Sequence, residues 1–535
     1  MRFTDFVGIL FDDFAPDSVW IREAAHLRLP PIDGCVGVVL TGEFRPHPEA
    51  RGRERGAPGV IFTVNGQVVG RLNPREPGPW ELRADLPRSV GTEGIEFGLR
   101  LTGTGWTNFL AWLGRISGLR SIQRFRLQNK NRQIRFRTLA TADGETIADF
   151  AKRDGPLSRD FARRHVQLGL NIVGYFAADL GVGESARCMV RAADAAGLPT
   201  AVVPFKLFCR NPQGDATYSA RLQDANPHRV NVFHIDPPVS RDIDHHHGPD
   251  FRRGKYNIAY FAWELPEFPD AWLSSFDYYD EVWCPSEFVR RSIAAKSPRP
   301  VLCMPHSIAF ARPETDRAGL RERFGLPTNG FLFLTLFDLN SYNERKNPQG
   351  ALAAFRASGL GGRGATLVIK VHNAAQNPAD LAALQSAARD IPSVVLLTET
   401  LSRADTYALE AACDSLVSLH RSEGFGLAVA ECMYLGRPVI STDWSATAEY
   451  VTADNGCPVA CRPVTLERSY GPYTRGATWA EPDVEHAAAH MRALVADPAL
   501  ASRLGAAARA TIESRFAPAV IGAAYRSRLE FIATF

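Results

Sequence analysis

The segment SLVSLHRSEGFGLAVAECMYLGRPVIST, residues 415–442, decides the fold class. An apolar strand leads into a turn with two glycines, a helix follows, and a further glycine ends the helix before the next apolar strand. Strand–helix–strand units build parallel sheets, because a parallel pair of strands needs a crossover connection. Gly424 and Gly426 let the backbone turn sharply and approach a ligand closely. The free N–H groups that open the helix predict an anion-binding site at the carboxyl end of a strand.

Two carboxylates belong to the same segment. Glu423 stands at the edge of the glycine turn, and Glu431 lies eight residues further on, within the helix. Carboxylates accept hydrogen bonds from hydroxyl groups, so the pair suits a sugar or a ribose and not a phosphate. The alternative is an ordinary turn between a strand and a helix, with two solvated glutamates.

Working outward, apolar runs alternate with Ala-rich stretches from about residue 166 to the last residue, which predicts two doubly wound α/β domains at 166–310 and 311–535. The strands expected in the first are 170–176, 200–205, 229–235, 256–263 and 280–286. Those expected in the second are 331–339, 365–371, 393–399, 414–420 and 437–442.

Residues 1–165 have a different texture. Short β-branched runs at 37–44, 59–72 and 95–103 are broken by Gly and Pro, and Asn65-Gly66 is typical of a two-residue hairpin turn. We therefore expect a β-rich accessory domain resembling a β-sandwich. It matches no family, and it could bind a glycan, hold a partner or brace the rest of the chain.

Composition excludes several classes of protein. The chain has 535 residues, 45% of them apolar and 22% charged, which is ordinary for a globular protein and rules out a disordered or coiled-coil chain. A net charge of +3 is too small to indicate a nucleic-acid partner. The nine cysteines have no zinc-type spacing, and no run of 18 apolar residues occurs. We expect a cytoplasmic protein with no metal site and no bound cofactor.

Scarce lysines mark a second candidate feature. Only seven occur in the chain, and just two follow residue 300. Lys346 comes directly after Arg345 in a polar loop, and Lys370 lies at the end of the next strand. Cations at strand ends on one rim are suited to holding a pyrophosphate, although a single lysine is more often simply solvated.

The first α/β domain offers weaker candidates. Gly181 and Gly183 precede a helix in the loop DLGVGESAR, but a lone G-x-G is weak evidence for a phosphate site. His234 closes the strand 229–235 and could contact a substrate in a cleft, although such a histidine is more often structural.

These motifs together resemble a known family. DLGVGESAR, FAWELPEFPDAW, DEVWCPSEFV, ERKNP and EGFGLAVAE occur in the order found in retaining nucleotide-sugar glycosyltransferases of the GT-B fold, the family-4-like group, over about two thirds of the chain. The last motif fits the E-x7-E signature at Glu423 and Glu431. In one respect the chain departs from the family: where many relatives carry a Gly-Arg pair, it has Asp338-Leu339-Asn340.

The resemblance implies a fold, a reaction and site residues. Two Rossmann-like domains would face each other across a cleft, with the donor bound mainly to the second and the last helix packing back on the first. Enzymes of this fold usually need no catalytic metal. Glu423 would contact the donor sugar and Glu431 the ribose, with Arg345 and Lys346 on the leaving diphosphate. The remaining implied contacts are His234 near the reaction centre, Gly181 and Gly183 beside the phosphates, and the backbone of Gly424, Phe425, Gly426 and Leu427.

The expected function is transfer of a hexose, with mannose favoured, to a glycan or lipid-linked acceptor in surface polysaccharide biosynthesis. The alternative is a non-catalytic sugar- or nucleotide-binding protein on the same fold. Residues 107–137 add a further hypothesis, because apolar residues at near-helical spacing alternate with arginines there. Such a helix could lie on a membrane surface, although packing on the β-domain is the more common fate.

Overall fold

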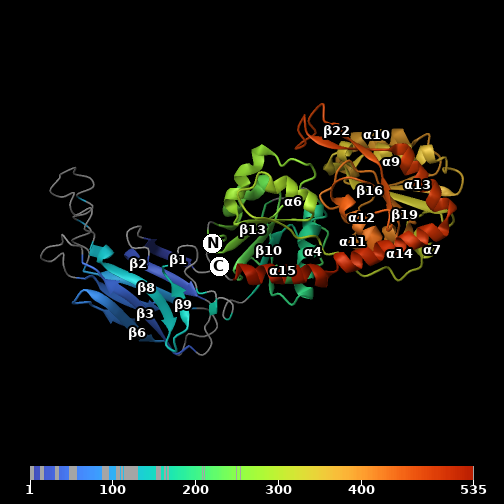
Figure 1. Ribbon diagram of the computed structural model, residues 1–535. Coiled ribbons are helices and arrows are strands. Elements are labelled where there is room, and N and C mark those ends of the chain that lie inside the picture. Colours follow the sequence, from blue (N-terminus) through green and yellow to red (C-terminus); the bar gives the residue numbers. More distant parts are fainter. Residues whose placement is uncertain are drawn as a thin grey trace. The chain divides into compact units, whose positions relative to one another are not determined.

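The computed structural model describes residues 5–11, 17–29, 35–46, 57–86, 95–103, 130–151 and 168–533, apart from residues 208, 210, 249 and 254, together with single positions between 109 and 164. The chain forms two compact units. One comprises residues 1–169, 252–256 and 527–535, and the other comprises residues 170–251 and 257–526 (Figure 1). In the described part of the chain, no helix combines the length and the apolar character needed to span a membrane.

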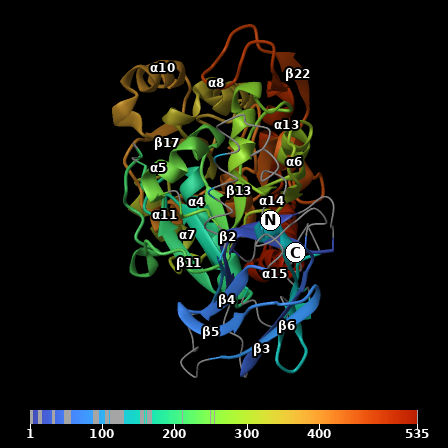
Figure 2. The same ribbon diagram turned by 90° about the vertical axis from the view of Figure 1, so that its left-hand side faces the viewer.

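The strands described in the first unit are antiparallel, and all nine belong to one hydrogen-bonded sheet. The sheet runs in the order β5-β4-β7-β2-β8-β3-β6, with β1 added to β2 and β9 to β8. Figure 2 labels five of these strands, β2 to β6. The predicted hairpin is present, since Asn65 and Gly66 join β4 to β5 with positive φ angles of 47° and 79°. The two-sheet sandwich remains a prediction. The bounds are β1 Asp5–Phe11, β2 Val19–Leu29, β3 Gly37–Phe44, β4 Gly59–Val64, β5 Gln67–Leu72, β6 Gly78–Asp85, β7 Ile95–Thr102, β8 Ile134–Thr141 and β9 Thr146–Asp149.

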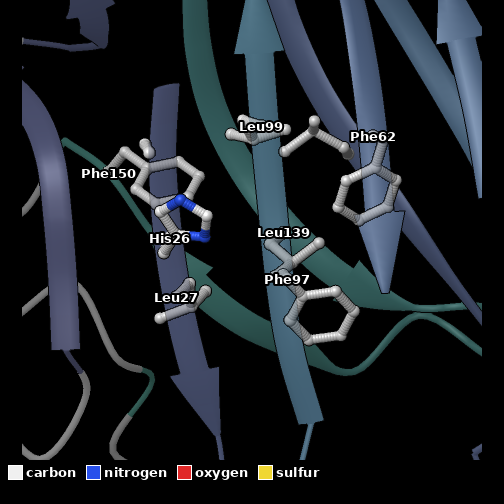
Figure 3. Close-up of a pocket in the computed structure, with 9 residues that line it drawn as sticks. His26, Leu27, Phe62, Phe97, Leu99, Leu139 and Phe150 are labelled. Carbon is white, nitrogen blue, oxygen red and sulfur yellow. The ribbon is translucent and has the colours of Figure 1, made fainter. Parts of the chain in front are cut away.

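Aromatic and aliphatic side chains fill the interior of this unit. Phe62 and Phe97 stack with their ring centroids 5.7 Å apart, and Leu99 and Leu139 lie beside them (Figure 3). The cavity among these side chains has a volume of only about 10 Å³. That is about the room a single water molecule needs, and the walls are almost wholly apolar. This cavity therefore belongs to the core and is too small to be a ligand site.

The second unit contains two six-stranded sheets of parallel strands. The first has the order β11-β10-β12-β13-β14-β15. Its strands β10 to β14 begin within one residue of the predicted positions. The short edge strand β15 was not predicted, because three half-buried residues carry no periodic signal. The bounds are β10 Leu170–Gly174, β11 Thr200–Pro204, β12 Val230–His234, β13 Tyr256–Tyr260, β14 Glu281–Cys284 and β15 Val301–Cys303, with helices α4 Gly181–Ala195, α5 Ile243–His247 and α6 Glu287–Ala294.

The second sheet has the order β18-β17-β16-β19-β20-β21. All five predicted strands are present, and β21 adds an unpredicted edge. A continuous apolar core fills the space between this sheet and its helices. The strands are β16 Phe331–Asp338, β17 Ala365–His372, β18 Val394–Leu397, β19 Ser415–Ser418, β20 Val439–Thr442 and β21 Cys457–Val459. The helices are α7 Arg317–Arg323, α8 Asn343–Lys346, α9 Pro348–Ser358, α10 Pro378–Ala388, α11 Arg403–Ala412, α12 Leu427–Tyr434, α13 Val484–Ala496 and α14 Pro498–Arg515.

Two later elements connect the second sheet to the first. The hairpin of β22 (Cys461–Thr465) and β23 (Thr478–Pro482) contributes Tyr473 and Trp479 to the apolar core of the first sheet. Helix α15 (Pro518–Ile532) also returns to that sheet, where Tyr525 stacks on Trp283 of β14 at 5.3 Å. The two sheets thus share packed side chains within one unit.

Candidate active site

A cavity of about 500 Å³ lies between the two sheets of the second unit. Its walls come from the residues that follow the strands, including Asp236 after β12, Glu264 after β13 and His306 after β15 on one side, with Asp338 ending β16 and His420 after β19 on the other. Ligands of open α/β sheets bind at the carboxyl ends of the strands. The cavity is therefore in the position where this fold class places its substrate.

Glu423 is the centre of a hydrogen-bond cluster in the cavity wall. Its Oε1 accepts from Lys346 Nζ at 2.6 Å, from Arg345 Nη1 at 3.1 Å and from His420 Nδ1 at 2.7 Å. Its Oε2 makes no hydrogen bond within the described part of the chain, and its backbone N–H donates to Ser445 Oγ. Oε2 is thus available to a ligand hydroxyl group.

The two cations fix the charge of this carboxylate. Burial alone would raise the pKa of Glu423, but Lys346 and Arg345 outweigh that effect and hold it well below the usual value. Burial and the neighbouring Arg345 lower the pKa of Lys346, while Glu423 opposes them. At neutral pH the cluster therefore carries one ionised carboxylate between two cations.

The loop before α9 delivers both cations. Lys346 ends the short helix α8, and Asn347 follows with a left-handed backbone (φ 49°) and caps α9 through its side chain. Arg345 is 4% exposed and also donates to the carbonyl of Ser422, beside Glu423. Two adjacent residues, Arg345 and Lys346, thus contact one carboxylate. In the Gly-Arg pattern described above, the arginine would instead stand near Asp338-Leu339-Asn340.

The glycine turn brings a helix N-terminus to the same place. Gly426 has a φ of 86°, and a Cβ atom there would lie 2.6 Å from Thr447 Cγ2, so only glycine fits. Helix α12 begins at Leu427, and the turn residues Gly424, Phe425 and Gly426 line the cavity with it. The first N–H groups of α12 therefore open beside Glu423.

Glu431 lies deeper along α12 and lines the same cavity. It is 3% exposed, and it pairs with Arg403 at the start of α11. Arg403 also approaches Glu184 of the first sheet's helix α4, with Nε 3.6 Å from Oε2. Arg187 and Arg191 complete the charge balance around Glu184. One guanidinium thus connects acidic groups from the two halves of this unit.

Three of the predicted site residues do not line the cavity. His234 is 0% exposed and lies behind Ser185 and Tyr260: Ser185 Oγ is 2.8 Å from Nδ1, and the Tyr260 ring stacks on the imidazole at 4.4 Å. A Cβ at Gly183 would lie 2.6 Å from the carbonyl oxygen of Tyr175, so close backbone packing requires this glycine. Lys370 is fully buried in β17, where its Nζ donates to Val371 O.

The other predicted residues line the cavity. They are Gly181, Arg345, Lys346, Glu423, Gly424, Phe425, Gly426, Leu427 and Glu431.

Polar contacts hold the first sheet's loops against the glycine turn. Ser286 Oγ donates to the carbonyl of Gly424 at 2.8 Å, and Ser422 Oγ donates to the carbonyl of Glu264. Tyr473 of the β22–β23 hairpin donates its hydroxyl to Glu264 Oε2 at 3.1 Å. These bonds hold the turn in position from outside its own sheet. A preorganised site requires such rigidity before the ligand binds.

Two charged or titratable cavity residues that sequence reasoning did not identify as site residues are His420 and Arg403. His420 stands three residues before Glu423 and just after a strand, which was a usable signal. Arg403 lies in no motif and was not recognisable, because its partners Glu431 and Glu184 are brought to it only by the tertiary fold.

Comparison with known proteins defines the class of this fold. Several solved structures are similar to about two thirds of the chain. One is Anabaena HepE in complex with UDP and glucose (13% identity, TM-score 0.51, covering 68% of this chain and 100% of that chain). Two further structures are similar to the same degree. One is a glycosyltransferase from Rickettsia africae (13% identity, TM-score 0.51, covering 68% of this chain and 98% of that chain). The other is sucrose-phosphate synthase from Thermosynechococcus elongatus (13% identity, TM-score 0.50, covering 68% of this chain and 99% of that chain). The second unit therefore has the α/β fold of GT-B type proteins.

Residues 321–511 match the family described as glycosyl transferases group 1. That segment holds the whole cluster around Glu423, together with Glu431 and Arg403. No curated protein sequence matches the chain. The chain carries a glycosyltransferase group 1 domain and is a transferase enzyme.

Proposed function

We propose that the enzyme transfers a hexose from a nucleoside diphosphate sugar to a glycan or lipid-linked acceptor with retention of anomeric configuration. One observation carries the proposal: Glu423, two cations and the N-terminus of α12 meet in a cavity at the carboxyl ends of both sheets. The likeness to HepE, whose structure holds UDP and glucose, supports a donor of this class.

Departure of a nucleoside diphosphate builds negative charge on the leaving oxygens. Arg345 and Lys346 can be drawn to those oxygens, because both already reach into the cavity wall. The free N–H groups at Leu427 and its neighbours add fixed dipoles. One preplaced donor of this kind contributes about 3 kcal/mol to the transition state. These groups can meet the leaving charge without a metal ion.

Glu423 suits the sugar itself. Its free Oε2 can accept a hydrogen bond from a hydroxyl group of the hexose, and its negative charge favours an oxocarbenium-like anomeric carbon. Glu431 lies further along α12 and is the group we assign to the ribose. To accept a ribose hydroxyl group it would give up part of its interaction with Arg403. In the retaining reaction that we propose, the acceptor oxygen attacks from the face that the leaving group occupied. The anomeric C–O bond to the diphosphate breaks as the new bond forms, and the acceptor proton passes to the leaving phosphate oxygen.

His234 would act through its neighbours. Ser185 and Tyr260 separate its ring from the cavity, so we propose that it positions these two residues near the reaction centre. The loop of Gly181 borders the phosphates, and Gly183 shapes that loop.

A donor panel tests this function. Purified enzyme is mixed with GDP-mannose, UDP-glucose and the ADP- and dTDP-sugars, and nucleotide release is measured beside Glu423→Ala and Lys346→Ala. Release from one donor that is lost in both variants would support the proposal. Glu485→Ala and Lys206→Ala are matched controls, because both side chains are exposed and neither lines the cavity. An NMR time course of the product that showed an inverted linkage would exclude retention.

The biological setting that we propose is surface polysaccharide biosynthesis, with mannose as the hexose to test first. Peripheral membrane contact through residues 107–137 would fit a lipid-linked acceptor. Most of that stretch lies outside the described residues. Flotation of the enzyme with anionic liposomes tests the contact, and an unchanged position in the gradient would reject it.

A further inference from the structure

His420 is a cavity residue with one satisfied and one unsatisfied ring nitrogen. It follows strand β19, and its side chain is 10% exposed. Nδ1 lies 2.7 Å from Glu423 Oε1. Nε2 is buried and finds no hydrogen-bond partner among the residues that the structure describes. A polar atom in that condition is rare in a folded protein and calls for an explanation.

The protonation of the ring follows from its surroundings. Burial and the charge of Lys346 lower the pKa of His420 to about 4, against the opposing effect of Glu423, so the imidazole is neutral at pH 7. A neutral imidazole has one N–H, and the ionised Glu423 can only accept. The hydrogen atom therefore lies on Nδ1, and Nε2 presents a bare lone pair.

A ligand that satisfies Nε2 must supply a hydrogen atom. Phosphate oxygens cannot do so at neutral pH, whereas a sugar hydroxyl group can. The only other acceptor of the same cluster that is left free within the described structure is Glu423 Oε2, which the sugar is proposed to contact. Each of these two free acceptors can accept a hydrogen bond from a hydroxyl group of the sugar.

We propose that His420 is a specificity-determining residue whose Nε2 accepts a hydrogen bond from a hydroxyl group of the transferred hexose. This inference rests on the proposed function, since it concerns the donor of that reaction. It adds that the enzyme distinguishes the hexose by a hydroxyl position that Glu423 alone does not read. A hexose that lacks this hydroxyl group leaves Nε2 buried and unpaired.

The test uses the donor identified by the panel, its 2-, 3-, 4- and 6-deoxy analogues, and calorimetric titration without acceptor. The analogue that lacks the hydroxyl group read by His420 should bind to the native enzyme about tenfold more weakly than the parent donor, as expected for one lost hydrogen bond to a buried group. His420→Asn can keep a donor near Nδ1 for Glu423 but has no atom at Nε2. In that variant the ratio for the same analogue should fall below about threefold.

His420→Gln provides the rescue, because its amide oxygen can reach the region of Nε2 and should restore part of the discrimination. All three proteins should bind the free nucleoside diphosphate with the same affinity, which shows that the fold and the phosphate contacts are intact. Full discrimination at every position in His420→Asn would overturn the inference while leaving the proposed function untouched. If no nucleotide sugar bound to the native enzyme, the proposed function would fall, and the inference with it.

Discussion

Lys346 Nζ lies 2.6 Å from Glu423 Oε1, although the two residues are 77 positions apart in the chain. Helix α8 delivers the lysine, and the turn after β19 delivers the glutamate. Arg345 donates to the same oxygen, so one carboxylate holds two cations ready in the cavity wall. A diphosphate that draws the cations away leaves the carboxylate free for the sugar. The cluster thus holds in place the groups that both ends of the donor need.

The first prediction concerns this lysine. Lys346→Met should lower kcat by about 100-fold, because one preplaced donor to the leaving charge is lost. Lys346→Arg should retain more activity, since a guanidinium can still reach both the carboxylate and a phosphate. Nucleotide release under saturating donor measures the effect. Equal losses in the two variants would show that the site requires the shape of the lysine and not its charge.

The order of elements in the second unit was predictable, and so was part of the cavity lining. Apolar runs separated by Ala-rich stretches located ten of its twelve parallel strands, since buried parallel strands are apolar throughout. The short edge strands β15 and β21 carry too few buried residues to be recognised. Glu423 and Gly426 line the cavity, and they could be located because a turn of that kind leaves a local pattern. The roles assigned to them stay predictions.

The positions of residues whose partners are set by the tertiary fold could not be predicted from the sequence. Lys370 lies near the end of strand β17, and its side chain is buried. Nothing in the sequence indicated this, since a lysine at the end of a strand is usually exposed. Nor did any local pattern place Arg403 beside Glu184, because the two residues lie in different halves of the unit.

The second prediction compares two glycines. Gly426→Ala should lower the free energy of unfolding by about 2 kcal/mol, because the residue has a φ of 86° and its new Cβ would lie 2.6 Å from Thr447 and 3.0 Å from the Tyr450 hydroxyl. Gly181→Ala is the matched control. It also lines the cavity, but nothing lies within 4 Å of its Cβ position and it begins helix α4. Urea denaturation should show a loss for the first variant only.

The third prediction concerns pH. Burial lowers the pKa of His306 to about 4, although Glu184 opposes that effect. The unfolded chain therefore binds a proton at about pH 6.5 that the folded protein does not bind until about pH 4. The resulting loss of stability begins as the pH falls through 6.5 and is complete near pH 4.

Thermal unfolding at pH 7 and pH 5 measures this loss. His306→Phe keeps an aromatic ring against Tyr260 and Phe425 but cannot titrate, so its melting temperature should fall less between the two pH values. The exposed His245 provides a control in His245→Gln, which should behave like the native protein. An equal fall in His306→Phe and the native protein would contradict the assignment.

The last prediction concerns the guanidinium that connects the two halves of the unit. Arg403 pairs with Glu431 and approaches Glu184, and all three groups are largely buried. Removing one partner of a buried ion pair leaves an uncompensated charge, at a cost of about 3–5 kcal/mol. Arg403→Met should therefore lower the free energy of unfolding by up to that amount, mainly through Glu431. Burial and the charge of Glu184 already raise the pKa of Glu431 against the effect of Arg403, so without the cation this carboxylate takes up a proton. Arg187 and Arg191, in contrast, still serve Glu184. Glu431→Gln removes the carboxyl group that would lose its partner, so the double variant should be more stable than Arg403→Met alone. Urea denaturation of the four proteins gives the coupling energy, and strictly additive losses would show that the two residues do not act as a pair.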